Sequence, residues 1–114
     1  MSSGRLPAKL EITGLARRIE ADGGFATTLH RGDPEGGALL LVVSSRGRHC
    51  ACLERILGIG GSYEWRRTGP AESAESGEVA AFLAKRVRFD PDLWAMELDI
   101  ADPERFIAET TSLG

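Results

Sequence analysis

Two cysteines near the middle of the chain are the residues that could most directly bind a metal. Cys50 and Cys52 are one residue apart, so in a strand both thiols point to one face and His49 points to the other. A closed zinc site takes about four ligands, usually from two such clusters. Only one cluster is present, and nothing requires His30 as a further ligand. We therefore predict reduced, buried thiols and no metal or other cofactor.

The densest group of carboxylates lies in the last third of the chain. Asp90 and Asp92 flank a proline, and Glu97 and Asp99 follow on a predicted strand. Paired carboxylates can hold Mg²⁺ or transfer protons, so Asp90, Asp92 and the neighbouring Trp94 form a candidate site for a small enzyme. Aspartates beside a proline also stabilise backbone turns. We favour a solvated turn and a solvent-facing strand surface, since no nucleophile motif supports catalysis.

A glycine-rich segment, residues 58–62, has the composition of a phosphate-binding loop. Such loops connect a strand to a helix, whose N-terminus supplies positive charge. The residues that follow, Tyr63, Glu64 and Trp65, instead have the alternation of a strand. This context favours a hairpin turn.

Four arginines lie where neighbouring strands of an antiparallel meander would end: Arg46, Arg48, Arg66 and Arg67. If they meet at one end of the sheet, their guanidinium groups form a candidate binding site for phosphate or carboxylate. The alternative is pairing with the three glutamates that follow directly, Glu72, Glu75 and Glu78. We favour this internal pairing, because surface arginines usually have only local partners.

Hydrophobic periodicity predicts three helices around these groups. Ile12, Leu15, Ala16 and Ile19 form a helical stripe that ends at residues 23–24, both glycine. A second helix carries Val79, Phe82, Leu83 and Val87 and stops at or before residue 90, because a proline follows. A third begins at residue 103, with Asp102 as its cap.

Runs of alternating or continuous apolar residues predict five strands, at residues 25–31, 38–44, 49–56, 62–67 and 93–100. In the fifth, Trp94, Met96 and Leu98 share one face and should point into the core. The element order α-β-β-β-β-α-β-α predicts one α+β domain over residues 1–114. We expect an antiparallel sheet of about five strands, four of them a meander, with the helices packed mainly on one face.

Composition restricts the class of protein further. The chain has 114 residues and a net charge of −3, and no apolar run approaches the ~20 residues that span a membrane. Residues 1–67 carry ten Lys and Arg against seven Asp and Glu, whereas the remainder carries four against ten. The overall basic character that favours nucleic-acid binding is absent. Nothing marks the chain for export, so we expect a cytoplasmic protein.

Four segments together resemble a known family, in the order 16–18 (ARR), 23–26 (GGFA), 31–33 (RGD) and 88–94 (RFDPDLW). The family consists of short alphaproteobacterial proteins filed as domain of unknown function 1491. The resemblance spans nearly the whole chain and implies a bacterial, intracellular protein. Because the family has no assigned activity, no catalytic residue can be carried over from it.

These observations favour a small, non-catalytic binding module that self-associates or docks onto another protein. The alternative is a weak binder of nucleic acid or another polyanion through the arginines, although the net charge does not support it. A third hypothesis is a small enzyme that uses Asp90 and Asp92.

Overall fold

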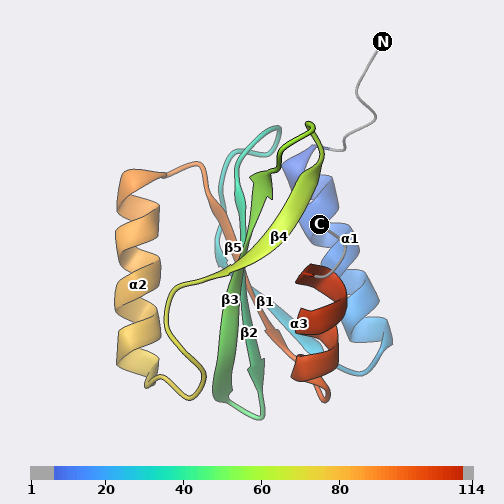
Figure 1. Cartoon of the computed structure of the whole chain (residues 1–114), viewed down its shortest axis with the longest axis vertical. Coiled ribbons are helices and arrows are strands. Elements are labelled where there is room, and N and C mark those ends of the chain that lie inside the picture. Colours follow the sequence, from blue (N-terminus) through green and yellow to red (C-terminus); the bar gives the residue numbers. More distant parts are fainter. Residues whose placement is uncertain (1–6, 112–114) are drawn as a thin grey trace.

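The computed structural model describes residues 7–111 and contains three helices and five strands in the predicted order (Figure 1). The helices are α1 (Ala8–Ala21), α2 (Ser76–Phe89) and α3 (Pro103–Thr111). The strands are β1 (Phe25–His30), β2 (Leu39–Ser45), β3 (Arg48–Leu57), β4 (Tyr63–Thr68) and β5 (Trp94–Asp99). The predicted α+β class and element order are thus confirmed, with small shifts at the element ends.

The five strands form one mixed sheet in the order β1-β5-β2-β3-β4. β2 and β5 run parallel, while the other neighbours are antiparallel. The prediction of a purely antiparallel sheet is therefore wrong, and so is the four-strand meander. The meander comprises only β2, β3 and β4, because β5 lies between β1 and β2.

Burial explains why β5 takes this central place. Residues 93–96 and Leu98 are almost completely buried, so both faces of the first part of β5 are covered. A strand buried on both faces belongs in the interior of a sheet. β1 alternates weakly, and most of its residues are exposed. Such a strand is suited to the edge of the sheet, where it pairs with β5 alone.

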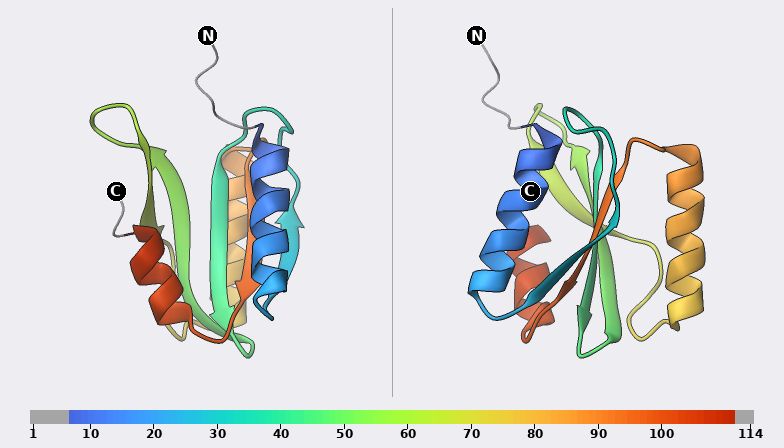
Figure 2. Two further views of the ribbon diagram at one scale, coloured as in Figure 1. Left: turned by 90° about the vertical axis from the view of Figure 1, so that its right-hand side faces the viewer. Right: turned by 180° about the vertical axis from the view of Figure 1, so that it is seen from behind.

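The helices cover both faces of the sheet, α1 and α3 on one side and α2 on the other (Figures 1 and 2). The expectation that they pack mainly on one face holds for α1 and α3, whereas α2 covers the opposite face. The aliphatic run of β2 shows the reason, since Leu41 packs in the core beneath α1 while Leu40 packs with Phe82 and Leu83 of α2. As predicted, Trp94 belongs to the α1 core. Within residues 7–111, no helix is both long and apolar enough to cross a membrane.

The loop between β1 and β2 crosses the start of β5 and does not close a hairpin. The Asp33 N–H donates to the Asp92 carbonyl at 3.0 Å, and the Trp94 indole N–H donates to the Asp33 carbonyl at 2.7 Å. A Cβ atom on Gly32 would lie 2.0 Å from the Asp92 carbonyl oxygen. The close approach of the two backbones therefore requires glycine at this position.

Candidate functional site

The turn between β2 and β3 consists of Arg46 and Gly47, both with positive φ, 53° and 80°. Positive φ at both central residues is the geometry of the tightest hairpins. The carboxylate of Asp99 accepts hydrogen bonds from both turn N–H groups, at 2.9 and 3.0 Å. Asp99 is partly buried and fastens the turn to the end of β5, a structural role that the prediction of a solvent-facing strand surface did not include.

A β-bulge follows this turn in β3. Val43 pairs with Ala51, whereas the next residue, Ser44, pairs with His49, so Cys50 is the extra residue. The extra residue shifts the alternation of side chains along β3 by one position. As a result, Cys50 packs in the α1 core while Cys52 packs under α2. The prediction that both thiols share a face is wrong for this reason.

The two thiols are accordingly separate groups in different environments. Burial raises the pKa of Cys52 to about 11. Burial also raises the pKa of Cys50, and the charge of Arg48 opposes that rise. Both thiols are therefore protonated at neutral pH, a form that is a poor nucleophile and metal ligand. In the described part of the chain, no three His, Cys, Asp or Glu residues are grouped so as to hold a metal.

Three of the four predicted arginines open onto one cavity of about 500 Å³, hereafter the arginine cavity. Arg46 and Arg48 reach it from the β2–β3 turn and Arg67 from the end of β4. The start of α3 and the β4–α2 loop complete its wall. The remaining lining residues are Ser45, Cys50, Glu72, Ala101, Pro103, Glu104 and Ile107.

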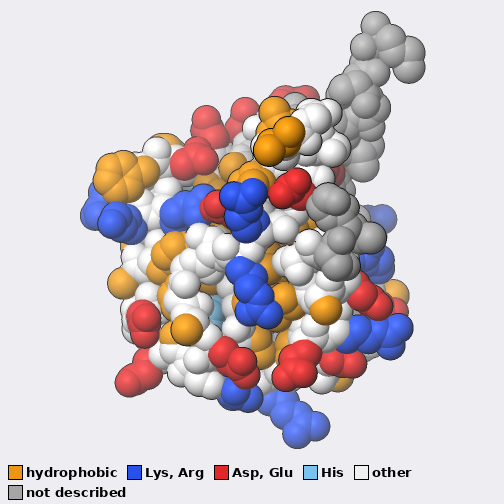
Figure 3. Space-filling model, in the orientation of Figure 1, with side chains coloured by type: hydrophobic (Ala, Val, Ile, Leu, Met, Phe, Trp, Pro, Cys, Tyr) orange, Lys and Arg blue, Asp and Glu red, His pale blue; other side chains and the backbone are white. Residues whose placement is uncertain are grey.

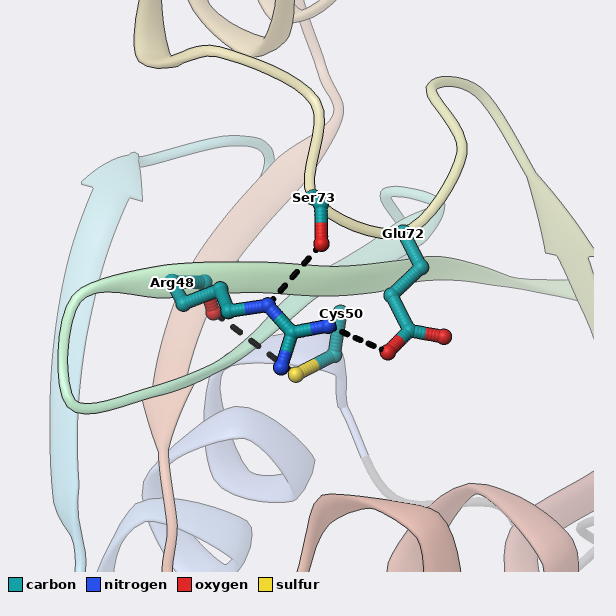
Figure 4. Close-up of polar contacts among 4 residues, drawn as sticks. All are labelled: Arg48, Cys50, Glu72 and Ser73. Atoms are coloured by element: carbon teal, nitrogen blue, oxygen red, sulfur yellow. Dashed lines mark hydrogen bonds and ion pairs between the residues drawn. The ribbon is translucent and has the colours of Figure 1, made fainter.

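Arg48 is held in place by the loop that follows β4 (Figure 4). Its Nη2 contacts a carboxylate oxygen of Glu72 at 2.7 Å, and its Nε donates to the Ser73 hydroxyl at 2.9 Å. The predicted internal pairing is thus realised for Arg48. Glu75 and Glu78 make no ion pair with an arginine among residues 7–111.

The other arginines differ in their surroundings. Among residues 7–111, the side chains of Arg46 and Arg67 form no ion pair or hydrogen bond. Arg66 lies outside the cavity and is 3.5 Å from a carboxylate oxygen of Glu64. Neighbouring residues of a strand point to opposite faces, so Arg66 and Arg67 cannot both enter the same cavity.

Asp90, Asp92 and Trp94 lie at the connection from α2 to β5. The Asp90 carbonyl accepts from the Leu93 N–H, and the Asp92 carbonyl accepts from the Asp33 N–H. Trp94 is buried and only 3% exposed. Backbone hydrogen bonds hold this turn, and one of them joins it to the β1–β2 loop. Asp92 is exposed on the surface.

The glycine-rich segment at residues 58–62 is a hairpin turn between β3 and β4, as predicted. The Gly58 N–H donates to the Ser62 carbonyl at 2.8 Å, and the Gly61 N–H donates to the Gly58 carbonyl at 3.2 Å. Gly60 and Gly61 both have positive φ. No helix follows the turn, so the segment lacks the helix N-terminus that a phosphate loop uses.

A second group of polar residues, which sequence reasoning did not bring together, lies under α2. Ser44, His49 and Glu97 line a cavity of about 260 Å³ on that face of the sheet. Ser44 and His49 flank the same predicted turn, which could have indicated their proximity. The contribution of Glu97 depends on the parallel pairing of β5 with β2, and the sequence carries no local sign of that pairing.

Comparison with known proteins gives one consistent result. Residues 6–108 match the family model described as "Protein of unknown function (DUF1491)". A crystal structure of a DUF1491 family protein from Caulobacter crescentus CB15, at 1.87 Å resolution, is similar with 27% identity and a TM-score of 0.73, covering 83% of this chain and 88% of that one. The solution structure of protein Atu0922 from A. tumefaciens has 28% identity and a TM-score of 0.67, covering 85% and 87%.

A search of curated proteins finds no match. The family model spans most of the chain, and the resemblance noted in the four sequence segments is confirmed. This chain therefore belongs to the DUF1491 family.

Proposed function

We propose that this protein is a non-catalytic binding module whose arginine cavity holds a compact anionic group, such as a phosphate or a carboxylate. The observation that carries the proposal is the convergence of Arg46, Arg48 and Arg67 on one hollow, where Arg46 and Arg67 have no carboxylate partner among residues 7–111. Unpaired guanidinium groups in a concave site favour an anion that several donors can reach together.

The acidic residues at the cavity limit the size of the anion. Glu72 and Glu104 also line the wall, and Glu72 is close to Arg48. A single anionic group can lie among the arginines, whereas an extended phosphate backbone would also lie against these carboxylates, which would repel it. On the face shown in Figure 3, Lys and Arg are interspersed with Asp and Glu and form no continuous basic stripe. This favours a compact group over a nucleic acid.

The chemistry of the wall supports binding over catalysis. The thiol in the wall belongs to Cys50, whose pKa is raised by burial, so it is a thiol and not a thiolate at neutral pH. No histidine lines the cavity. The wall thus offers positive charge and hydrogen-bond donors to an anion.

Titration of the protein with inorganic phosphate, followed by amide NMR shifts, tests this function. Arg67→Gln should weaken binding about tenfold or more, since losing a hydrogen bond to a charged group costs about 1.5–3 kcal/mol. Arg66→Gln is the matched control, because it removes the same charge from the same strand outside the cavity. Its affinity should stay within about twofold of the wild type.

Two results would contradict the proposal. One is equal weakening by Arg66→Gln and Arg67→Gln, which would indicate a general charge effect. The other is phosphate binding too weak to saturate, combined with tight, strongly salt-dependent binding to a single-stranded oligonucleotide. That combination is the behaviour of a polyanion binder.

A second candidate function is self-association through the free edge of β1. This strand has six residues, none of them Asp, Glu, Lys or Arg, and its Phe25 and Leu29 are 72% and 40% exposed. Natural edge strands usually carry charges that prevent pairing with another sheet. Two copies of β1 can pair antiparallel without bringing like charges together, which favours a second copy of the chain as partner.

Light scattering over a range of protein concentrations tests this second function. A concentration-dependent dimer should dissociate in Thr27→Lys, which places a charge at the centre of β1. Ala81→Lys, at an exposed position on α2, is the control and should leave the mass unchanged. A monomer at all concentrations would rule out self-association and leave the anion site untouched.

A further inference from the structure

The cavity under α2 combines an apolar wall with four polar side chains, those of Ser44, His49, Ser76 and Glu97, and it is separate from the arginine cavity. Its volume is about 260 Å³, the space of about nine water molecules in the liquid. Strands β1, β2, β3 and β5 and the first turns of α2 each contribute to it. The apolar side chains in its wall are Leu29, Val42, Ala74, Val79, Ala80 and Leu83.

Ser44 and Glu97 form a hydrogen-bonded pair in the wall. The Ser44 hydroxyl donates to Oε2 of Glu97 at 3.0 Å, and Ser44 is only 2% exposed. The hydroxyl hydrogen is used in this bond, so the free lone pairs of Ser44 can only accept. Among residues 7–111, Oε1 of Glu97 has no hydrogen-bond partner, and a carboxylate oxygen is likewise an acceptor.

His49 adds a third acceptor. It is 7% exposed, and its Nε2 lies 3.2 Å from the Pro70 carbonyl. A carbonyl can only accept, so Nε2 carries a hydrogen, and in that tautomer Nδ1 is an acceptor. Nδ1 is buried and has no hydrogen-bond partner in the described structure. Buried polar atoms without a partner are rare in folded proteins and call for an explanation.

We infer that the cavity under α2 is a binding site for a small amphipathic cation, an amine or a similar multi-donor group on an apolar body. Glu97 supplies one full negative charge and a free acceptor oxygen, which an ammonium group complements. The Ser44 hydroxyl and the buried Nδ1 of His49 are further acceptors in the wall, and the Ser76 hydroxyl can accept or donate. The aliphatic wall matches an apolar chain. The N-terminus of α2 opposes a cation with about half a unit charge, which is less than the charge of Glu97.

A matched set of three ligands tests the charge preference: n-hexylammonium, hexan-1-ol and hexanoate. All three carry the same apolar chain, and methyl NMR shifts of Leu29, Val79 and Leu83 report binding in the cavity. We expect saturable shifts with the ammonium ion, at least about tenfold weaker binding of the alcohol, and none of the carboxylate. Equal binding of the alcohol or the carboxylate would overturn the inference, as would the absence of saturable shifts with all three.

Two variants locate the site. Glu97→Gln keeps an acceptor for Ser44 but removes the charge, so hexylammonium affinity should fall at least about tenfold. Ala80→Phe places a ring in the wall from an exposed position on α2 and should abolish binding even if Glu97→Gln fails to fold. Ala81→Phe, next to it and outside the wall, is the control and should bind normally. Unchanged affinity in Glu97→Gln or Ala80→Phe would overturn the site.

Discussion

Replacing Trp94 with alanine is expected to lower the free energy of unfolding by about 3–5 kcal/mol. The side chain is 3% exposed, and a buried tryptophan covers roughly 150–250 Å². At about 25 cal/mol per Å² this area corresponds to about 4–6 kcal/mol, an upper bound because unfolded chains retain some burial. The Asp33 carbonyl also loses its indole donor, which lies at 2.7 Å.

A second variant separates packing from this hydrogen bond. Trp94→Phe retains most of the apolar ring but removes the N–H, so it should cost about 1–3 kcal/mol, the range for leaving a buried acceptor unpaired. Trp65→Phe is the control, because Trp65 is only partly buried and packs at the margin of the core. Its cost should stay below about 1.5 kcal/mol.

Urea unfolding followed by far-UV circular dichroism measures all three variants, because tryptophan fluorescence itself changes with the substitution. A loss below about 1 kcal/mol for Trp94→Ala would refute the reasoning, since a fully buried tryptophan cannot be removed at that cost. Equal losses for Trp94→Ala and Trp94→Phe would refute the assignment of the larger share to packing.

Two further predictions follow from the glycines and the thiols. Gly32→Ala should destabilise by about 1–3 kcal/mol or more, because its Cβ would overlap the Asp92 carbonyl, while Gly36→Ala, with open space around it, should change stability by less than about 1 kcal/mol in urea unfolding. Burial raises the pKa of Cys52 from 9.0 to about 11, so the folded state favours the protonated thiol. This preference stabilises the fold fully below pH 9.0, and the stabilisation is lost as the pH rises to about 11. Unfolding free energy measured across this range should fall by up to roughly 2–3 kcal/mol more in the wild type than in Cys52→Ala.

The order of the elements could be predicted because each carries its own local signal. The helical stripe of Ile12 and Ile19 and the alternation of Trp94, Met96 and Leu98 depend only on nearby residues, and both are buried as expected. The order of strands in the sheet depends on pairing between distant segments, which a local pattern does not encode. The continuous aliphatic run of β2 is typical of a strand with both faces covered, and Leu40 and Leu41 do pack on opposite faces of the sheet.

The candidate site could be predicted only in part, for the same reason. Strand alternation and two hairpin turns were enough to bring Arg46, Arg48 and Arg67 to one cavity. Alternation also places Arg66 and Arg67 on opposite faces of β4, so the four predicted arginines could not all line one cavity. The bulge at Cys50 was unpredictable, because an extra residue in a strand leaves no trace in hydrophobic periodicity, and it decides which face His49 joins.

The central position of β5 also determines when the sheet can be completed. β1 pairs only with β5, and its Phe25 lies opposite Asp99, more than seventy residues later in the chain. During synthesis β1 therefore has no partner strand until β5 has emerged, while β2, β3 and β4 can pair as soon as they are made. Such long-range pairing closes large loops and slows folding. Folding of this protein should thus begin in the β2–β4 meander and end with the insertion of β5.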